Sequence, residues 1–529
     1  MAGPRSAIAH RVVADARTRA LSFSALFFAV VWANAAGYKS TYPRPEDRVK
    51  LVANFADNKA ARMLYGAGHD LVTVGGYTAW RAGGLLAVFA GLFGIFAATR
   101  AMRTEEDAGR SELVLAGAVT RTGAFVASLT GIAVTLAGLW VATTLAALAG
   151  GLPLRGSCFF GLVLLAVAAV YVAVAAVTNQ VFPTRRGALG AAALVLGIDF
   201  LLRIVADTTD HFFVHWFTPL GWAEEMRAFS GSHAIVVVLP VVSTFVLVTD
   251  AGILHARRDL GGAYVAPRDS ATAHTRLLSS PFALAVRLDR ITIISWVLSI
   301  AAFALVIGTV AKSVEQLDLP QSLRDQITKL GGIDITRAKG YVGLTFVIFV
   351  FAIGLFVCGQ LAAARDEETT HRLETLFALP YGRERWLQGR VVVIVAGTAA
   401  CAMTAGAGVG LGVLVTHGHM TFAQGLEAGV NVLPIELLFI GAGVLFLAFA
   451  PRLGIGLLYG LVVLGFVWEL FGALLSFPSW LLDVSPYHHL APSPAKPIAV
   501  APALVMMAIA AVTTIVGAAR FRHRDLAGD

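Results

Sequence analysis

Long apolar stretches constrain this sequence more than any other feature. About twelve of them reach roughly 18 residues or more, the length that a helix needs to cross a bilayer. Of the 529 residues, 57% are hydrophobic and 14% are charged, whereas about 25% are charged in soluble domains. The stretches lie near residues 20–37, 80–99, 123–149, 157–178, 187–205, 234–254, 291–311, 341–364, 388–416, 430–450, 454–474 and 498–519. The sequence therefore predicts an all-α, polytopic membrane protein with about 12 transmembrane helices.

The first apolar stretch admits a second interpretation. It follows several arginines and ends near the small residues "ANAAG", which is also the pattern of a cleaved signal peptide. An equivalent internal stretch follows Arg287 and Arg290 in the second half of the chain. We therefore favour a retained transmembrane span.

The charge distribution argues against a nucleic-acid-binding protein. The net charge is +8, but the short links on one side of the membrane are basic if the N-terminus is cytoplasmic, as the positive-inside rule requires. We expect a multi-pass protein of the plasma membrane with both termini in the cytoplasm and lipid around it. Cys158, Cys358 and Cys401 lie far apart in or beside apolar stretches, so we expect buried side chains and no metal site.

An internal repeat divides the chain into two halves. The segments "RRDLGG" from Arg257 and "HRDLAG" from His523 close the halves at an offset of 266 residues. We predict a six-span half at 1–262, a cytoplasmic linker at 263–280 and a second six-span half at 281–529, related as parallel repeats. Each half begins with an amphipathic, arginine-bearing stretch suited to the inner interface. At an offset of 262 residues the identical pairs are Arg103/Arg365, Glu105/Glu367, Glu106/Glu368, Arg110/Arg372, Glu112/Glu374, Ala116/Ala378 and Arg121/Arg383.

The most charged parts of the repeat are two acidic stretches, which we expect to form short cytoplasmic helices. Thr104 or Asp366 is placed to cap each N-terminus, and the acids that follow suit the positive end of the helix dipole. Gly117 and Pro380 are expected to end these helices. Two glutamates have an arginine four residues later, which favours ion pairing: Glu106–Arg110 and Glu368–Arg372. One interpretation is a solvated helix tip; the other is a pair of docking surfaces for a two-fold symmetric partner, which the repeated charge order favours.

The order of elements resembles a known transporter family. An amphipathic stretch, a span, a long outer loop, a second span, the pattern "R-x-E-E-x-x-x-R-x-E" and four more spans occur twice. This order resembles the membrane (permease) subunits of ATP-binding-cassette (ABC) exporters, and the tandem-fused form resembles the tetronasin-type drug and antibiotic-efflux permeases of actinobacteria. The resemblance implies that the acidic stretches are coupling helices seated in a groove of the ATPase. It carries this role to Glu105, Glu106, Arg110, Glu112, Glu367, Glu368, Arg372 and Glu374.

The same resemblance implies a separate ATPase. The chain contains no G-x-x-x-x-G-K-[ST] motif and no loop long enough for an ATPase domain. We therefore expect a transport subunit with no enzymatic activity and no cofactor of its own. ATP and Mg are expected on two copies of a partner cassette ATPase.

The resemblance places a substrate cavity between the second and fifth spans of each half. These spans contain aromatic side chains suited to a hydrophobic small molecule such as a drug or antibiotic. Ordinary helix packing or lipid contact is the alternative for any one of them. The candidates are Phe89, Phe93, Phe96, Phe200, Phe349, Phe356, Phe466 and Phe471.

Several charged residues lie inside predicted spans, where they need a partner or a function. Asp199 and Arg203 are four residues apart and can pair on one helix face. Arg203 also corresponds to Glu469 at the repeat offset, so a contact between these two across the halves, as an outer gate or clasp, is the alternative. Glu436 is a further intramembrane acid that can carry protons or neutralise a cationic drug.

Two other classes of protein fit part of the sequence. A proton-coupled secondary multidrug carrier also has twelve spans in two halves, but it favours a basic, glycine-rich inner loop where this chain has acids. A membrane enzyme such as a glycosyltransferase needs convergent acids on one outer loop. The outer segment "SPYHHLAPSP" offers His488, His489 and nearby Asp483, without ligand spacing on a helix face or a nucleophile motif.

Overall fold

The fold is described from a computed structural model of the full sequence. The structure describes residues 4–55, 59–104, 106, 109, 116–117, 119–208, 212–259, 261–265, 277–278, 280–315, 337–378, 382–474 and 479–525. All regular structure in these ranges is helical, and the predicted all-α class is confirmed. The chain divides into two compact units, Met1–Ser270 (unit 1) and Ala271–Asp529 (unit 2), and each is described by itself.

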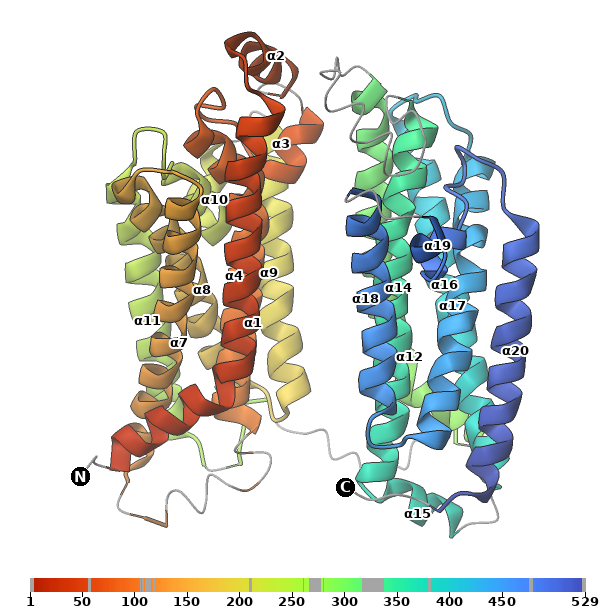
Figure 1. Cartoon of the computed structure of the whole chain (residues 1–529). Coiled ribbons are helices and arrows are strands. Elements are labelled where there is room, and N and C mark those ends of the chain that lie inside the picture. The colour runs from red at the N-terminus through yellow and green to blue at the C-terminus, as the bar shows by residue number, and fades with distance from the viewer. Residues whose placement is uncertain are drawn as a thin grey trace. The chain divides into compact units, whose positions relative to one another are not determined.

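Unit 1 is a bundle of long helices with short elements between them (Figure 1). The long helices are α1 (Pro4–Thr41), α4 (Val74–Thr99), α7 (Arg121–Ala149), α8 (Leu154–Val181), α9 (Arg185–Thr208) and α11 (Val238–Arg257). A π-helix, η1 (Arg100–Thr104), continues α4 directly. The other short elements are α2 (Pro45–Phe55), α3 (Lys59–Tyr65), η2 (Phe212–Phe217), α10 (Pro219–Glu225) and η3 (Ala234–Val237).

Unit 2 repeats this plan. Its long helices are α12 (Pro281–Glu315), α14 (Ala338–Thr369), α16 (Arg383–Val415), α17 (Phe422–Phe449), α18 (Gly454–Leu474) and α20 (Val500–His523). Its short elements are α15 (Arg372–Phe377), α19 (Ser479–Leu482) and η4 (Pro486–His489). Each of the twelve predicted apolar stretches lies mainly on one long helix, and the stretch at 234–254 begins in η3.

The long helices have the length and composition of membrane spans. Among the described residues, eleven helices qualify, and the apolar part of α18, Gly454–Glu469, is shorter than 18 residues. Several of these helices begin at an N-cap residue. Thr73, Thr120 and Thr421 each accept a hydrogen bond from the backbone N–H three residues later. This bond satisfies a donor that the first helical turn leaves free. The chain is therefore a multi-pass membrane protein.

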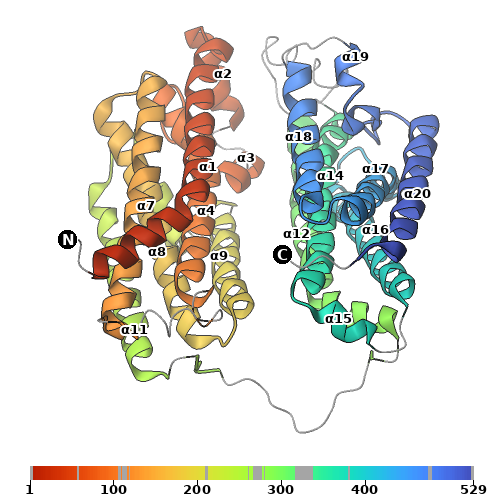
Figure 2. The same cartoon turned by 60° about the horizontal axis from the view of Figure 1, so that its bottom comes forward.

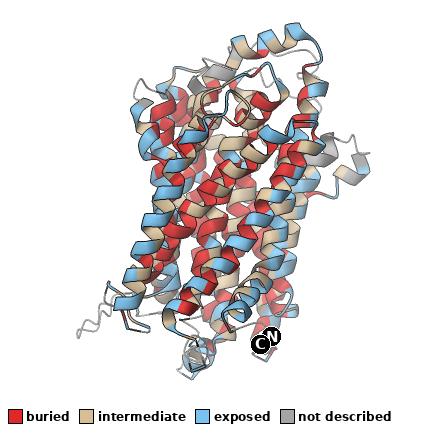
Figure 3. Cartoon of the chain, turned by 90° about the vertical axis from the view of Figure 1, so that its left-hand side faces the viewer, coloured by how far each residue is buried: buried red, intermediate tan, exposed pale blue. Residues whose placement is uncertain are grey.

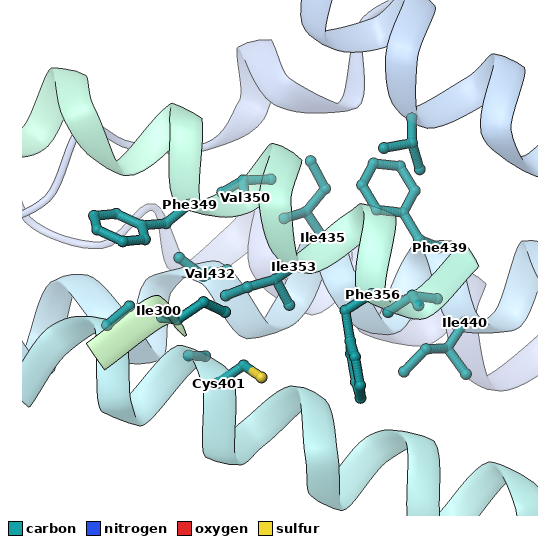
Figure 4. Packing of buried hydrophobic residues seen from close by; sticks show 14 of the residues in the cluster. Ile300, Phe349, Val350, Ile353, Phe356, Cys401, Val432, Ile435, Phe439 and Ile440 are labelled. Atoms are coloured by element: carbon teal, nitrogen blue, oxygen red, sulfur yellow. The ribbon is translucent and has the colours of Figure 1, made fainter. Parts of the chain in front are cut away.

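Each unit buries a core made by its own helices. In unit 2, Phe349, Ile353 and Phe356 of α14 pack against Val432 and Phe439 of α17 (Figure 4). Buried residues line the inner sides of the helices, and exposed residues line the outer sides (Figure 3). Apolar outer surfaces are expected where lipid covers the protein.

The start of α1 crosses one end of unit 1 obliquely before the helix turns along the bundle (Figures 1 and 2). This segment carries Arg5, Arg11, Arg17 and Arg19, which suits the membrane–water interface. We call this end of unit 1 its basal end. The basal end of unit 2 is the end that holds α15.

Glycines allow α12 and α16 to pack closely in unit 2. A Cβ atom on Gly412 would lie 2.5 Å from the backbone oxygen of Leu305, and a Cβ atom on Gly308 would lie 2.3 Å from that of Val409. Side chains cannot occupy such positions, so these helices meet backbone to backbone, as small residues permit in membrane bundles.

We expect Gly412→Ala to destabilise the detergent-purified chain by about 1–3 kcal/mol, because the added methyl group forces α12 and α16 apart. Gly456→Ala in α18 is the matched control, since its Cβ would meet nothing within 4 Å. The control should be neutral or stabilised by up to about 1 kcal/mol through helix propensity. Urea unfolding followed by tryptophan fluorescence measures both variants. Equal effects in the two would contradict the backbone-contact account.

Candidate functional site

The basal end of unit 1 holds a largely enclosed glutamate bound by two arginines. Arg258, just beyond α11, donates from Nη1 to Glu106 Oε1 and from Nη2 to Glu106 Oε2, at 2.6 Å each. Arg103 of η1 donates to Glu106 Oε2 at 3.2 Å. The backbone N–H of Gly261 donates to Oε1 at 2.8 Å. We call Glu106, Arg258 and Arg103 the unit 1 clamp.

The same cluster occurs at the basal end of unit 2. Arg524, just beyond α20, donates from Nη1 and Nη2 to the two carboxylate oxygens of Glu368, at 2.7 Å each. Arg365 lies 2.9 Å from Glu368 Oε2. All three residues correspond to those of unit 1 at the repeat offsets. We call Glu368, Arg524 and Arg365 the unit 2 clamp.

Each clamp also holds the start of a third long helix. Arg121, the first residue of α7, donates to the backbone oxygen of Arg258 at 2.8 Å. Arg383, the first residue of α16, donates to the backbone oxygen of Arg524. Each clamp therefore joins the end of the second long helix, the start of the third and the end of the sixth.

Burial and geometry make these pairs strong. The side chains of Glu106 and Glu368 are 10% and 2% exposed. Burial disfavours the ionised form of Glu106, but the hydrogen bonds from Arg258 and Gly261 outweigh it, so the pKa of Glu106 lies below its usual value. Bidentate arginine–carboxylate pairs are among the strongest polar contacts. Removing one partner of a buried pair costs about 3–5 kcal/mol.

The predicted boundaries of the second acidic stretch are wrong. Asp366 does not cap a new helix, because the apolar helix α14 continues past it and includes Glu368. His371, in the left-handed region with φ at 57°, separates α14 from α15, which begins at Arg372. Glu368 binds Arg524 in place of the predicted i,i+4 partner, since Arg524 offers both guanidinium nitrogens.

Most of the first acidic stretch lies outside the described residues. This applies to Glu105, Arg110 and Glu112, so their predicted helix and roles stay predictions. Sequence reasoning missed the clamp arginines Arg258 and Arg524, although the repeated "RDL" segments that contain them were a signal.

Glu367 belongs to a second buried network in unit 2. It pairs with Arg390 of α16 and accepts a hydrogen bond from Trp386 Nε1 at 3.2 Å. Arg390 also pairs with Asp289 of α12. This network ties α12, α14 and α16 together beside the unit 2 clamp.

The remaining predicted coupling residues are exposed on α15. Arg372 and Glu374 face outward, while Leu373 between them is buried. Glu374 Oε1 lies 2.9 Å from His371 Nδ1, with both side chains more than half exposed. α15 is therefore a short charged helix, seated by Leu373 directly after the unit 2 clamp.

The predicted aromatic residues have different environments. Phe349 and Phe356 are fully buried in the core of unit 2, as expected if they serve ordinary helix packing and do not line a substrate cavity. Phe93 is also buried and lies 5.0 Å from Phe23, between ring centroids. Phe466 stacks on Phe351 at 4.4 Å.

Three further aromatic candidates are less enclosed. Phe96 is 41% exposed and Phe89 is half-buried on α4. Phe200 lies beneath the guanidinium of Arg203, 5.1 Å from it. The side chain of Phe471 lies outside the described part of the structure. A role in a substrate cavity stays a prediction for these residues.

Arg203 lies in an ion cluster at the end of unit 1 opposite the clamp. The predicted ion pair between Arg203 and Asp199 is wrong. Arg203 instead contacts Asp207 at 3.4 Å and Glu224 at 2.9 Å. Asp207 is one helical turn after Arg203, so the helical spacing alone allowed either partner. Asp199 instead accepts hydrogen bonds from Tyr171 and from the backbone N–H of Leu220.

His215 completes this cluster. It lies 3.0 Å from Asp207 and 3.2 Å from Glu225. Burial opposes the charged form, but these two hydrogen bonds outweigh it and raise the pKa of His215 to about 10. Ligand atoms of Asp207, His215 and Glu224 lie within 4.8 Å of one another, a spacing that can hold a metal ion. Arg203 already supplies a cation to both carboxylates, so the cluster is neutralised by protein groups.

Glu469, the predicted partner of Arg203, contacts His488 in its own unit at 3.3 Å. His488 also lies 3.9 Å from Asp483. Arg203 and Glu469 thus each have a partner in their own unit, and a gate formed by the two stays a prediction.

We expect Arg524→Gln to lower the free energy of unfolding by about 3 kcal/mol, because Glu368 then loses its bidentate partner while buried. Arg372→Gln is the control, since Arg372 is exposed on α15; it should change the same quantity by less than about 0.5 kcal/mol. Urea unfolding of both purified variants measures the difference. If Arg524→Gln and Arg372→Gln lower the free energy of unfolding equally, the clamp does not hold the basal end together.

Comparison with known proteins identifies the family. Residues 278–522 match the family described as "Multidrug efflux system permease Rv1217c, C-terminal domain". Over 501 residues the chain is 30% identical to the multidrug efflux system permease protein Rv1217c of Mycobacterium tuberculosis (strain ATCC 25618 / H37Rv), covering 93% of this chain and 89% of that protein. The predicted resemblance to drug-efflux permeases is confirmed. The chain belongs to the family of multidrug efflux system permeases that includes Rv1217c.

Proposed function

We propose that this permease is the membrane subunit of an ATP-driven ABC exporter. Two copies of a cassette ATPase would bind at the basal ends, and they would hold the ATP and Mg. The basal ends and both chain termini would then be cytoplasmic. The name of the Mycobacterium tuberculosis relative supports multidrug efflux as the activity.

The placement of α15 carries this proposal. Arg372 and Glu374 are exposed, whereas Leu373 is buried and the unit 2 clamp lies directly before the helix. A charged helix anchored in this way presents its side chains at a defined position, as docking requires. Movement of α15 would pass to α14, α16 and α20, because the clamp joins those three helices.

A hydrophobic small molecule is the proposed cargo. The name of the Mycobacterium tuberculosis relative supports drugs as the class of cargo. Exposed Phe96 and half-buried Phe89 give α4 an apolar aromatic surface that suits such a molecule.

One observation favours a proton-coupled carrier as the second candidate. Glu436 of α17 is fully buried, and neither of its carboxylate oxygens has a hydrogen-bond partner among the described residues. A buried carboxyl group without partners is accommodated far more easily neutral than charged. Intramembrane acids of this kind serve as proton sites in transporters.

We expect Glu374→Lys to reduce recovery of the partner ATPase with the tagged chain by roughly tenfold, because reversed charge at a docking surface repels the partner. Glu46→Lys is the matched control, an exposed acid on α2, which should leave recovery unchanged. Pull-down in mild detergent with mass spectrometry and an ATPase assay measures both. Equal recovery from the two variants would remove α15 as the docking helix.

Transport in proteoliposomes separates the two candidate functions. The exporter account predicts ATP-dependent drug transport that resists a proton uncoupler and survives Glu436→Gln. Transport by the purified chain on a proton gradient alone, abolished by Glu436→Gln, would establish the carrier instead.

A further inference from the structure

Unit 1 contains a cavity at its basal end that the proposed function does not use. The space within it, together with the open solvent at its mouth, is about 1170 Å³. The walls come from α1, the end of α4 with η1, α7, α8 and the end of α11. The oblique segment of α1 forms one side of the cavity, and this segment crosses the basal end of unit 1 (Figures 1 and 2). Its arginines suit the membrane–water interface.

The mouth of this cavity is positively charged. Five arginines line it and only two carboxylates do. One of these, Glu106, is already bound by Arg258. The other, Asp15, lies 3.8 Å from Arg11. The guanidinium of Arg100 is exposed and has no ion-pair partner among the described residues. The mouth therefore retains positive charge for an anion.

The interior combines an apolar wall with an unused hydrogen-bond acceptor. Val12, Phe125 and Ile132 supply apolar surface. Asn179 is 1% exposed, and its Oδ1 has no hydrogen-bond partner in the described structure. A buried acceptor of this kind is normally satisfied, so a bound molecule with a hydroxyl group would complete it.

The repeat shows that this cavity is not required by the fold. The residues of unit 2 that correspond to Ala124, Ser128 and His255 of the cavity lining are Trp386, Arg390 and Phe521. Trp386 and Phe521 stack at 5.6 Å, and Arg390 pairs with Asp289 and Glu367. Unit 2 thus fills this position with large side chains. An empty cavity lowers the stability of a fold. That unit 1 keeps this cavity open therefore points to a molecule that occupies it.

We propose that the basal cavity of unit 1 binds one anionic phospholipid, with its phosphate at the arginine mouth and an acyl chain along the apolar wall. Arginines at the interface attract anionic lipid headgroups, and the guanidinium group binds phosphate well. A hydroxyl-bearing headgroup would also supply the donor that Asn179 lacks. The proposal does not rest on the proposed ATPase coupling, although Glu106, Arg121 and Arg258 at the unit 1 clamp also line the cavity.

Native mass spectrometry of the full chain tests the proposal, with phosphatidylglycerol and phosphatidylcholine of matched chains as probes. We expect one retained phosphatidylglycerol per chain and roughly fivefold weaker binding for Arg100→Gln, which removes one interfacial arginine. Ala124→Trp should abolish retention of the lipid, because it places an indole ring in the cavity at the position that corresponds to Trp386 of unit 2. Thr122→Trp is the matched control, an exposed site two residues away that does not line the cavity.

Each part of this experiment has a result that would contradict the proposal. Equal retention of phosphatidylcholine would show that charge plays no part. Unchanged retention in both Arg100→Gln and Ala124→Trp would place the lipid elsewhere. If oleate displaces phosphatidylglycerol at equal concentration, the site takes a fatty-acid anion, and the phospholipid assignment fails. Arg100→Gln lies on an exposed side chain, so the test holds even if Ala124→Trp does not fold.

Discussion

A buried carboxylate at the end of a membrane helix must be paired, and this requirement shapes the basal end of both units. Glu106 comes just after α4 and η1, Glu368 lies in the last turn of α14, and both side chains lie largely out of water. Their bidentate arginines come from beyond the last long helix of each unit, roughly 150 residues later in the chain. The pair therefore brings the second and sixth long helices together, and the hydrogen bonds from Arg121 and Arg383 add the third.

The two units share this clamp and differ in what surrounds it. Unit 2 adds the Asp289–Arg390–Glu367 network and the stacked pair of Trp386 and Phe521. Unit 1 has Ala124, Ser128 and His255 where unit 2 has Trp386, Arg390 and Phe521, and it has an open cavity there. The repeat thus preserves the contacts that join helix ends, while the spaces beside them have diverged.

The sequence predicted the spans, the repeat and the family, because hydropathy over a span's length and a doubled charge pattern are local signals. It did not predict ion-pair partners. Arg203 has acids at both i−4 and i+4 on its own helix. It contacts the later one, Asp207, and the fold of α10 brings Glu224 against it as well. Glu368 raised the same difficulty, since the distant Arg524 binds it in place of the predicted neighbour Arg372. The sequence did not predict the basal cavity for a similar reason, because residues from five helices form its walls.

A double-mutant cycle on each clamp tests the central claim most directly. Glu368→Gln, Arg524→Gln and the double variant, with the corresponding set for Glu106 and Arg258, are compared by their free energies of unfolding. The account predicts a coupling energy of roughly 2 kcal/mol or more within each clamp, as for contacting buried groups. Coupling energies within about 0.5 kcal/mol of zero would contradict it, since the glutamates and arginines would then not depend on each other for holding the helix ends together.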